Sequence, residues 1–372
     1  MSDFILPFDF SEDDPGRSRG QLLLNEPLPY PIGNQGSGFY RPGRMILENQ
    51  TSIDMVLYHN PATAQFIYTH TTKPNPHLLA LTGLKPEEIQ SIQTLTLPGQ
   101  LIMGSQRSFL ISQAIQAMLG SPIFQNLFTS QQQTQIAVFP IAREGLKYQV
   151  TEAIYANSGY LCDEVILDAH HVFDSNVPVF SRKVEMTLFK DKDLNKIQHE
   201  NITVAFIADS IASGLVMREV INKIKERFPR IQWVEVIAPF ATLRGLCRIT
   251  ECDGSENIHI RVHSFETLLN ALPPDYYYSA HFNIPELHIR PDLERAYREW
   301  WGQDDAGNWI ADTACAGYGW SEVFYSPRKQ IEMINEQLTA RHNLTITDIL
   351  RRNLVASERA VALVEQAQAD QG

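Results

Sequence analysis

Residues 206–216 read Phe206-Ile207-Ala208-Asp209-Ser210-Ile211-Ala212-Ser213-Gly214-Leu215-Val216. The β-branched apolar run at 202–207 predicts a buried strand that ends just before Asp209. An amphipathic helix is predicted after the loop, because apolar residues recur at every fourth position: Val216, Val220, Ile224 and Phe228. A buried strand thus delivers an acid at its end, and a short glycine-containing turn leads directly into a helix.

Strands and helices alternate on both sides of this segment. Further strands are predicted at 135–141, 164–167, 232–238 and 258–263, the last of them half-buried because its polar and apolar residues alternate. Such alternation predicts an α/β fold with a mainly parallel twisted sheet flanked by helices. Ligands of these sheets bind beyond the carboxyl ends of the strands, so we expect function in the loops after Ile141, Ile207 and Ile237 and near Gly317.

Three regions are predicted along the chain. Residues 1–45 are dense in proline and glycine, which favours an extended arm without a core of its own. Residues 46–326 are expected to form the α/β domain, helical up to about 130 and with an aromatic-rich insertion at 273–308 whose rings belong to the core. Residues 327–372 predict a C-terminal helical extension, with helices at about 328–340 and 346–368.

Composition excludes several classes of protein. The 372 residues carry a formal net charge of −12, so bulk nucleic-acid binding through a surplus of Lys and Arg is not expected. No run of 18 apolar residues predicts a membrane span, and the first 14 residues lack the basic and apolar regions of a secretory signal. Four cysteines in a chain of this length predict reduced thiols and a cytoplasmic protein.

The loop after the 202–207 strand has the chemistry of a phosphate site. Backbone N–H groups at a helix N-terminus form a cradle for a dianionic phosphate. Ser213 adds a hydroxyl, Gly214 permits close approach to the backbone, and Asp209 is placed to accept hydrogen bonds from ribose hydroxyls. The alternative is an ordinary strand–turn–helix capped by Ser213, which any doubly wound sheet contains.

Four segments, in order, resemble type I phosphoribosyltransferases and in particular their uracil phosphoribosyltransferase branch. The stretch 208–214 is similar to the family's strand followed by acids, small residues and a hydroxyl–glycine pair. Pro140-Ile141-Ala142-Arg143-Glu144-Gly145-Leu146 is similar to its Pro-Ile-Leu-Arg-Ala-Gly-Leu. The last two are 236–246, similar to its Ala-Pro-Glu-Gly turn, and 309–317, similar to its base-recognition stretch.

The resemblance implies an enzyme that transfers ribose 5-phosphate between phosphoribosyl pyrophosphate (PRPP) and a base, with Mg²⁺ bound through PRPP. It implies catalytic roles for Asp209, at the ribose hydroxyls, and for Arg143, as a clamp on pyrophosphate. The implied substrate-binding residues are Ala212, Ser213, Gly214 and Leu215 around the 5′-phosphate, Gly145 in the pyrophosphate loop, and Ala316 and Gly317 near the base. A phosphorylated ribose or nucleotide is the implied small-molecule partner, and a homo-oligomer the implied assembly.

The sequence also departs from the family pattern. The first of its two acids is Ala208, and residues 315–320 lack the acids of the base-recognition stretch, so uracil itself is not the expected acceptor. Two other readings stay open: a nucleotide-sensing or regulatory protein that keeps the fold without catalysis, and an assembly subunit with a vestigial pocket. Likewise, Arg143 has the alternative of a simple salt bridge to Glu144 or another acid.

Overall fold

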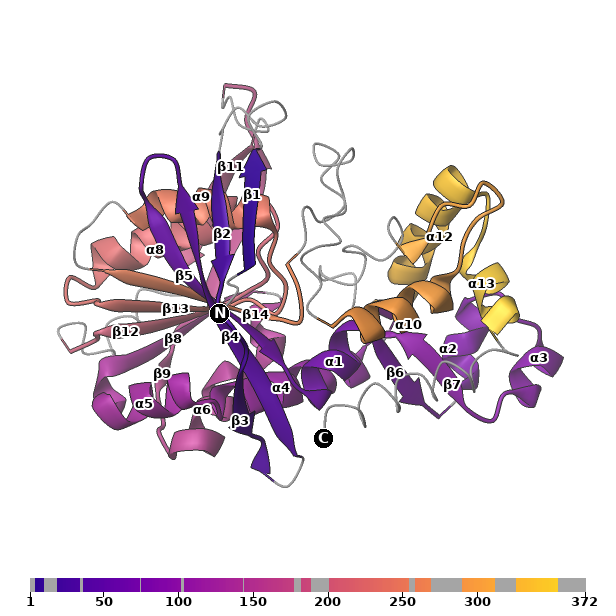
Figure 1. The fold of residues 1–372 in the computed structure, drawn as a ribbon, viewed down its shortest axis with the longest axis horizontal. Coiled ribbons are helices and arrows are strands. Elements are labelled where there is room, and N and C mark those ends of the chain that lie inside the picture. Colours follow the sequence, from indigo (N-terminus) through magenta and orange to yellow (C-terminus); the bar gives the residue numbers. More distant parts are fainter. Residues whose placement is uncertain are drawn as a thin grey trace.

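The structure is a computed structural model that describes residues 4–9, 19–33, 36–73, 75–101, 104–142, 144–176, 182–188, 201–253, 258–268, 290–311 and 326–353. Within these ranges the chain forms a mixed α/β architecture: one large sheet with helices on both faces, and a smaller lobe beside it (Figure 1). No helix in these ranges is both long and apolar enough to span a membrane.

Parallel strands form the centre of the large sheet. Along the sheet the order is β5 (Ser52–His59), β14 (His259–Phe265), β13 (Trp233–Ile237), β12 (Val204–Ala208), β8 (Ile136–Ala142), β10 (Leu167–Phe173) and β11 (Arg182–Leu188). Adjacent strands from β5 to β10 are parallel, whereas β11 is antiparallel to β10, and the short β9 (Asp163–Glu164) pairs with β8. Every residue of β12 is buried, as expected for a parallel strand covered on both faces.

The N-terminal region extends this sheet with antiparallel strands. They are β1 (Phe4–Asp9), β2 (Arg19–Leu24), β3 (Leu28–Pro31) and β4 (Ser37–Leu47), and β4 pairs with β5. The predicted arm over residues 1–45 therefore supplies edge strands in its described part. The prediction of helical structure from 46 to 130 is wrong for β5 and for the strands at 69–72 and 95–98, because short, largely buried runs do not distinguish a strand from a buried helix.

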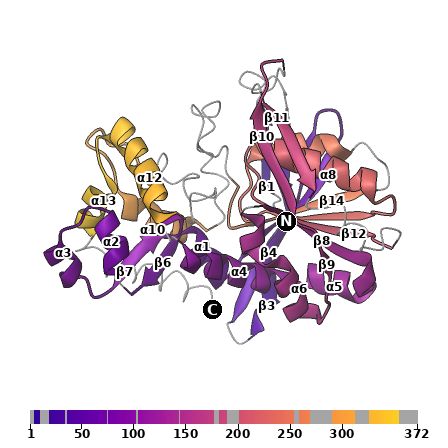
Figure 2. The same ribbon diagram turned by 180° about the vertical axis from the view of Figure 1, so that it is seen from behind.

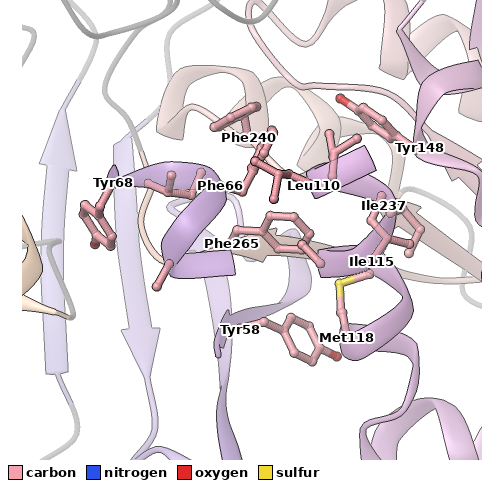
Figure 3. Packing of buried hydrophobic residues seen from close by; sticks show 14 of the residues in the cluster. Tyr58, Phe66, Tyr68, Leu110, Ile115, Met118, Tyr148, Ile237, Phe240 and Phe265 are labelled. Atoms are coloured by element: carbon pink, nitrogen blue, oxygen red, sulfur yellow. The ribbon is translucent and has the colours of Figure 1, made fainter. Parts of the chain in front are cut away.

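Helices cover both faces of the sheet. On one face α4 (Ser105–Leu119), α5 (Pro122–Ser130) and α6 (Val150–Ser158) pack against inward residues of β8, β12 and β14. On the other face lie α8 (Leu215–Arg227) and α9 (Leu243–Thr250). Figure 3 shows the first core from close by: Phe66, Phe240 and Phe265 converge near the residues that α4 contributes.

β14 keeps the predicted alternation over residues 259–262, where His259 is exposed and Ile260 is buried, but the prediction is wrong at the end of the strand, where residues 263–265 are all buried. His263 is fully buried, and its Nε2 lies 2.6 Å from Oε2 of buried Glu235 on β13. Its Nδ1 lies 3.1 Å from the hydroxyl of Tyr58 on β5. Burial, the largest cause, lowers the pKa of His263. Polar side chains are therefore tolerated in the interior here, because they hydrogen-bond to one another across β5, β14 and β13.

The smaller lobe joins segments far apart in the sequence (Figures 1 and 2). Its elements are α1 (Pro61–Ile67), β6 (Thr69–Thr72), α2 (Pro76–Leu81), α3 (Pro86–Ser91), β7 (Leu95–Pro98), α10 (Pro291–Trp301), α12 (Pro327–His342) and α13 (Ile346–Asn353). The indole of Trp300 donates to the Thr96 carbonyl at 3.0 Å, and Trp300 and Trp301 are buried, which confirms the core role expected of these rings. The predicted C-terminal helices are confirmed up to Asn353, with Asn343 between them at φ 52°.

Candidate functional site at the β8/β12 switch point

The strand order identifies where a ligand would enter. Counted from β8 along the chain, the sheet runs 3-2-1-4-5-6, so the direction of winding reverses between β8 and β12. In open α/β sheets the crevice beyond the carboxyl ends at such a reversal is the usual ligand site. Here that position is flanked by Glu144, two residues after β8, and by Asp209, directly after β12.

The loop from Asp209 to Gly214 is held against the next loop of the sheet. Ile211 and Ala241 form a parallel bridge, in which the Ile211 N–H donates to Phe240 O at 2.9 Å. The Thr242 hydroxyl donates to Ala212 O at 2.6 Å, and the Arg248 guanidinium donates to Ser213 O. These contacts fix the loop on its α9 side, so its shape is set before any ligand arrives.

Two glycines make this contact possible. Gly214 has φ 77°, in the left-handed region that suits glycine, and a Cβ there would lie 2.4 Å from Gly245 O. A Cβ on Gly245 would in turn lie 2.5 Å from Ala212 O. The sequence analysis expected Gly214 to allow a phosphate to approach the backbone. In the structure, the group that approaches Gly214 closely is the backbone of α9 at Gly245. Ser213 is buried, and its Oγ accepts a hydrogen bond from Leu215 N at 3.4 Å.

α8 begins directly after this glycine. Its first backbone hydrogen bond of the i→i−4 type runs from Arg218 N to Gly214 O at 2.9 Å. The N–H groups of the preceding turn therefore have no carbonyl within the helix, which is general for a helix N-terminus. Together with the helix dipole, they favour an anion beside residues 212–216.

A pair of carboxyl groups lies on the other side of the loop. Glu144 Oε1 accepts from the Tyr148 hydroxyl at 2.9 Å and from Ser210 Oγ at 3.1 Å, and these two hydroxyls are 2.7 Å apart. Burial, followed by the charge of Asp209, raises the pKa of Glu144 well above its usual range. Burial also raises the pKa of Asp209 to about 7, from an ordinary 3.8. The two groups together thus carry at most about one negative charge near neutral pH.

A buried arginine completes the surroundings of this pair. Arg107 on α4 donates to Gly99 O at 2.5 Å, and its guanidinium lies 4.4 Å from the centre of the Phe66 ring and 5.7 Å from that of Phe240. Its charge acts to lower the pKa of Glu144, against the larger effect of burial. Figure 3 shows Tyr148, Phe240 and Phe66 around the same part of the core.

The structure brings together most of the residues predicted for the site. Asp209, Ala212, Ser213, Gly214 and Leu215 form one continuous loop at the reversal. Gly145 lies at the end of β12, where a Cβ would stand 1.9 Å from Ala208 O, so this position needs glycine to keep β8 and β12 loops in contact. Arg143, Ala316 and Gly317 lie outside the described residues.

Sequence reasoning missed several members of the site. Glu144 was considered only as an ion-pair partner of Arg143, and Tyr148, Ser210 and Arg107 were assigned no role. Glu144 could have been predicted from the sequence, because it is an acid directly after a buried strand, in a loop where function was already expected. The described residues contain no group of three or more His, Cys, Asp or Glu side chains able to hold a metal ion.

No family model matches the sequence, and no curated protein matches it. Among solved structures, the chain is similar to adenine phosphoribosyltransferase from Trypanosoma brucei in complex with AMP, pyrophosphate and ribose-5-phosphate, at 11% identity and a TM-score of 0.33, over 57% of this chain and 83% of that one.

Two further solved structures are similar at the same level. One is a hypothetical protein from Neisseria gonorrhoeae with bound ppGpp, at 10% identity and a TM-score of 0.28, over 42% of this chain and 80% of that one. The other is a hypoxanthine phosphoribosyltransferase from Staphylococcus aureus, at 12% identity and a TM-score of 0.28, over 41% and 73%. At these TM-scores the similarity does not assign a function to this chain. The functional proposal therefore depends on the geometry of the site.

Proposed function

We propose that the protein is a phosphoribosyltransferase-like enzyme that transfers ribose 5-phosphate between PRPP and a base-like acceptor other than uracil. The observation that carries the proposal is the loop 209–214, which joins Asp209 at the end of β12 to the first turn of α8 at the β8/β12 reversal. An acid beside an amide cradle suits a molecule that has sugar hydroxyls at one end and a phosphate at the other.

The parts of the substrate would be held as follows. The amides from Ala212 to Leu215 and the first turn of α8 take the 5′-phosphate, and Asp209 accepts hydrogen bonds from the ribose. Arg143 clamps the pyrophosphate with its planar fork, and Gly145 allows that loop to lie against β12. Ala316 and Gly317 are proposed to lie near the base.

In the reaction the bond from ribose C1 to the pyrophosphate oxygen breaks with its electron pair leaving on pyrophosphate. A bond then forms from C1 to a nitrogen of the base, and that nitrogen gives up its proton. Positive charge develops on the sugar in between, so the ionised carboxylate of Asp209 stabilises it, and the rigid loop supplies orientation. This chain needs no rearrangement at the moment of transfer, because contacts with α9 already fix the loop.

Mg²⁺ is the proposed cofactor. As the family resemblance implies, the cation would be carried by the pyrophosphate of PRPP. When bound, it would neutralise charge on the leaving pyrophosphate. A cytoplasmic location and assembly into a homo-oligomer complete the proposal.

Calorimetric titration of PRPP, with and without Mg²⁺, tests this function. We expect Mg²⁺-dependent binding of PRPP at roughly micromolar concentration. This binding should be lost in Ser213→Asp, because the new carboxylate repels the 5′-phosphate. Ser91→Asp, at an exposed position on α3, makes the same chemical change away from the site and is expected to bind like the wild type. Absence of PRPP binding by the wild type would refute the proposal.

One observation favours a second candidate, a nucleotide sensor. Ala208 takes the place of the first motif acid and is fully buried at the end of β12, so no side chain there reaches a ligand. Asp209→Ala separates the two functions. An enzyme would lose turnover by orders of magnitude, whereas a sensor has no turnover to lose and would show only weaker binding of nucleotide.

A further inference from the structure

In both Glu144 and Asp209, one carboxyl oxygen accepts hydrogen bonds from the residues that the structure describes and the other accepts none. Glu144 Oε1 takes both hydroxyl donors, and Asp209 Oδ1 accepts from Ser210 N at 2.9 Å. Within the described part of the chain, Glu144 Oε2 and Asp209 Oδ2 accept no hydrogen bond. The free oxygens therefore belong to carboxyls at the ends of two adjacent strands, and both carboxyls contact Ser210.

The chemistry of this pair suits hydroxyl groups better than phosphate. Burial raises the pKa of both carboxyls, and the charge of Asp209 acts further to raise the pKa of Glu144, so we assign the retained proton of the pair to Glu144. Glu144 then donates through Oε2 while Asp209 accepts through Oδ2. A hydroxyl both donates and accepts, whereas a phosphate oxygen only accepts and is repelled by the charge on Asp209.

We propose that Glu144 acts with Asp209 as a two-strand carboxyl pair that holds the vicinal hydroxyls of ribose. This inference depends on the proposed function, and it assigns to Glu144 the sugar contact that Ala208 lacks the side chain to make. Parallel strands lie about 4.8 Å apart, which brings both carboxyls within reach of one sugar ring. The site then selects ribose over deoxyribose, because a missing hydroxyl leaves a half-buried carboxyl without its partner.

The experiment is calorimetric titration with two probes, ribose 5-phosphate and 2,3-dideoxyribose 5-phosphate. The wild type is expected to bind ribose 5-phosphate at least about tenfold more tightly, the effect of losing hydrogen bonds to a charged group. Glu144→Met keeps the side-chain volume, and Tyr148 and Ser210 remain hydrogen-bonded to each other at 2.7 Å. This variant should bind ribose 5-phosphate about tenfold more weakly and the dideoxy probe as the wild type does.

Two further variants separate a direct contact from a structural role. Glu144→Gln replaces the acid O–H by an amide N–H donor and is expected to retain the wild-type preference within about threefold. Glu152→Ala removes an exposed acid from α6 and should change neither affinity. A structural defect in Glu144→Met would weaken both probes equally, and that result would overturn the inference.

The remaining outcomes are also decisive. Equal binding of the two probes by the wild type overturns the sugar contact, whether or not Glu144→Met folds, and leaves phosphate binding in place. A preference that survives in Glu144→Met assigns the hydroxyls to Asp209 alone and likewise overturns the role of Glu144. Failure of the wild type to bind either probe or PRPP refutes the proposed function itself.

Discussion

Asp209→Asn is expected to stabilise the protein at alkaline pH while it removes the charge that the site needs. The pKa of Asp209 is raised from 3.8 to about 7, chiefly by burial. Between these values the native state keeps a proton that the unfolded chain has released, so the stability of the wild type falls as the pH rises from about 4 to about 7. Asparagine has the same shape and retains an oxygen to accept from Ser210 N, but it does not titrate.

The size of the effect follows from the same values. A tenfold change in proton affinity corresponds to about 1.4 kcal/mol, so the interval from 3.8 to about 7 amounts to about 4 kcal/mol for a group held rigidly. About 3 kcal/mol of this falls between pH 5 and pH 7. Because Asp209 is half-buried, solvent reduces the figure, and we expect a gain of about 1–3 kcal/mol for Asp209→Asn on going from pH 5 to pH 8.

Urea denaturation of wild type and Asp209→Asn at pH 5 and pH 8 measures this difference directly. Asp305→Asn, in an exposed loop of the smaller lobe, is the matched control and should show no pH-dependent gain. A stability difference between wild type and Asp209→Asn that is the same at both pH values would refute the reasoning. So would a variant less stable than the wild type at pH 8.

Two further substitutions probe the loop and the core. Gly214→Ala should lower the free energy of unfolding by about 2–4 kcal/mol and abolish phosphate binding, since its Cβ meets Gly245 O as well as a left-handed backbone. Gly159→Ala has a similar backbone (φ 75°) with nothing within 4 Å, and should cost only about 1–2 kcal/mol; equal losses in urea denaturation would contradict the contact with α9. Glu235→Ala should cost about 1–3 kcal/mol, because it leaves the buried His263 Nε2 without its hydrogen-bond partner. The exposed Glu185→Ala on β11 should cost less than about 0.5 kcal/mol, and a comparable melting temperature for the two would show that the buried pair contributes nothing.

The sequence predicted the elements whose pattern is local. β8, β12, α8 and β13 have strong apolar runs or helical spacing, and their positions were predicted to within a few residues. β5 was missed because its second half is buried on both faces, which erases the alternation there. The predicted alternation of β14 holds over residues 259–262 and fails at His263, since nothing in the residues of that strand shows that Glu235 lies within hydrogen-bond distance of His263.

The same distinction holds for the site. Asp209 and Gly214 were found because they follow one strand directly, and their loop is complete in the local sequence. The contact of Glu144 with Ser210 joins residues 66 apart, and it exists only because β8 and β12 are neighbours in the sheet. The position of Arg107 depends on the packing of α4 against two aromatic rings from different segments. These contacts require the topology, which spacing along the chain does not supply.

The pairing of β5 with β14 has a consequence for how the chain is synthesised. Residues 52–59 find their parallel partner only at 259–265, so β5 and the antiparallel strands attached to it wait for about 200 residues of further translation. At 5–20 residues per second that delay is roughly 10–40 s. During this time the N-terminal strands would leave the ribosome with one apolar edge unpaired, the condition under which chaperones bind nascent chains.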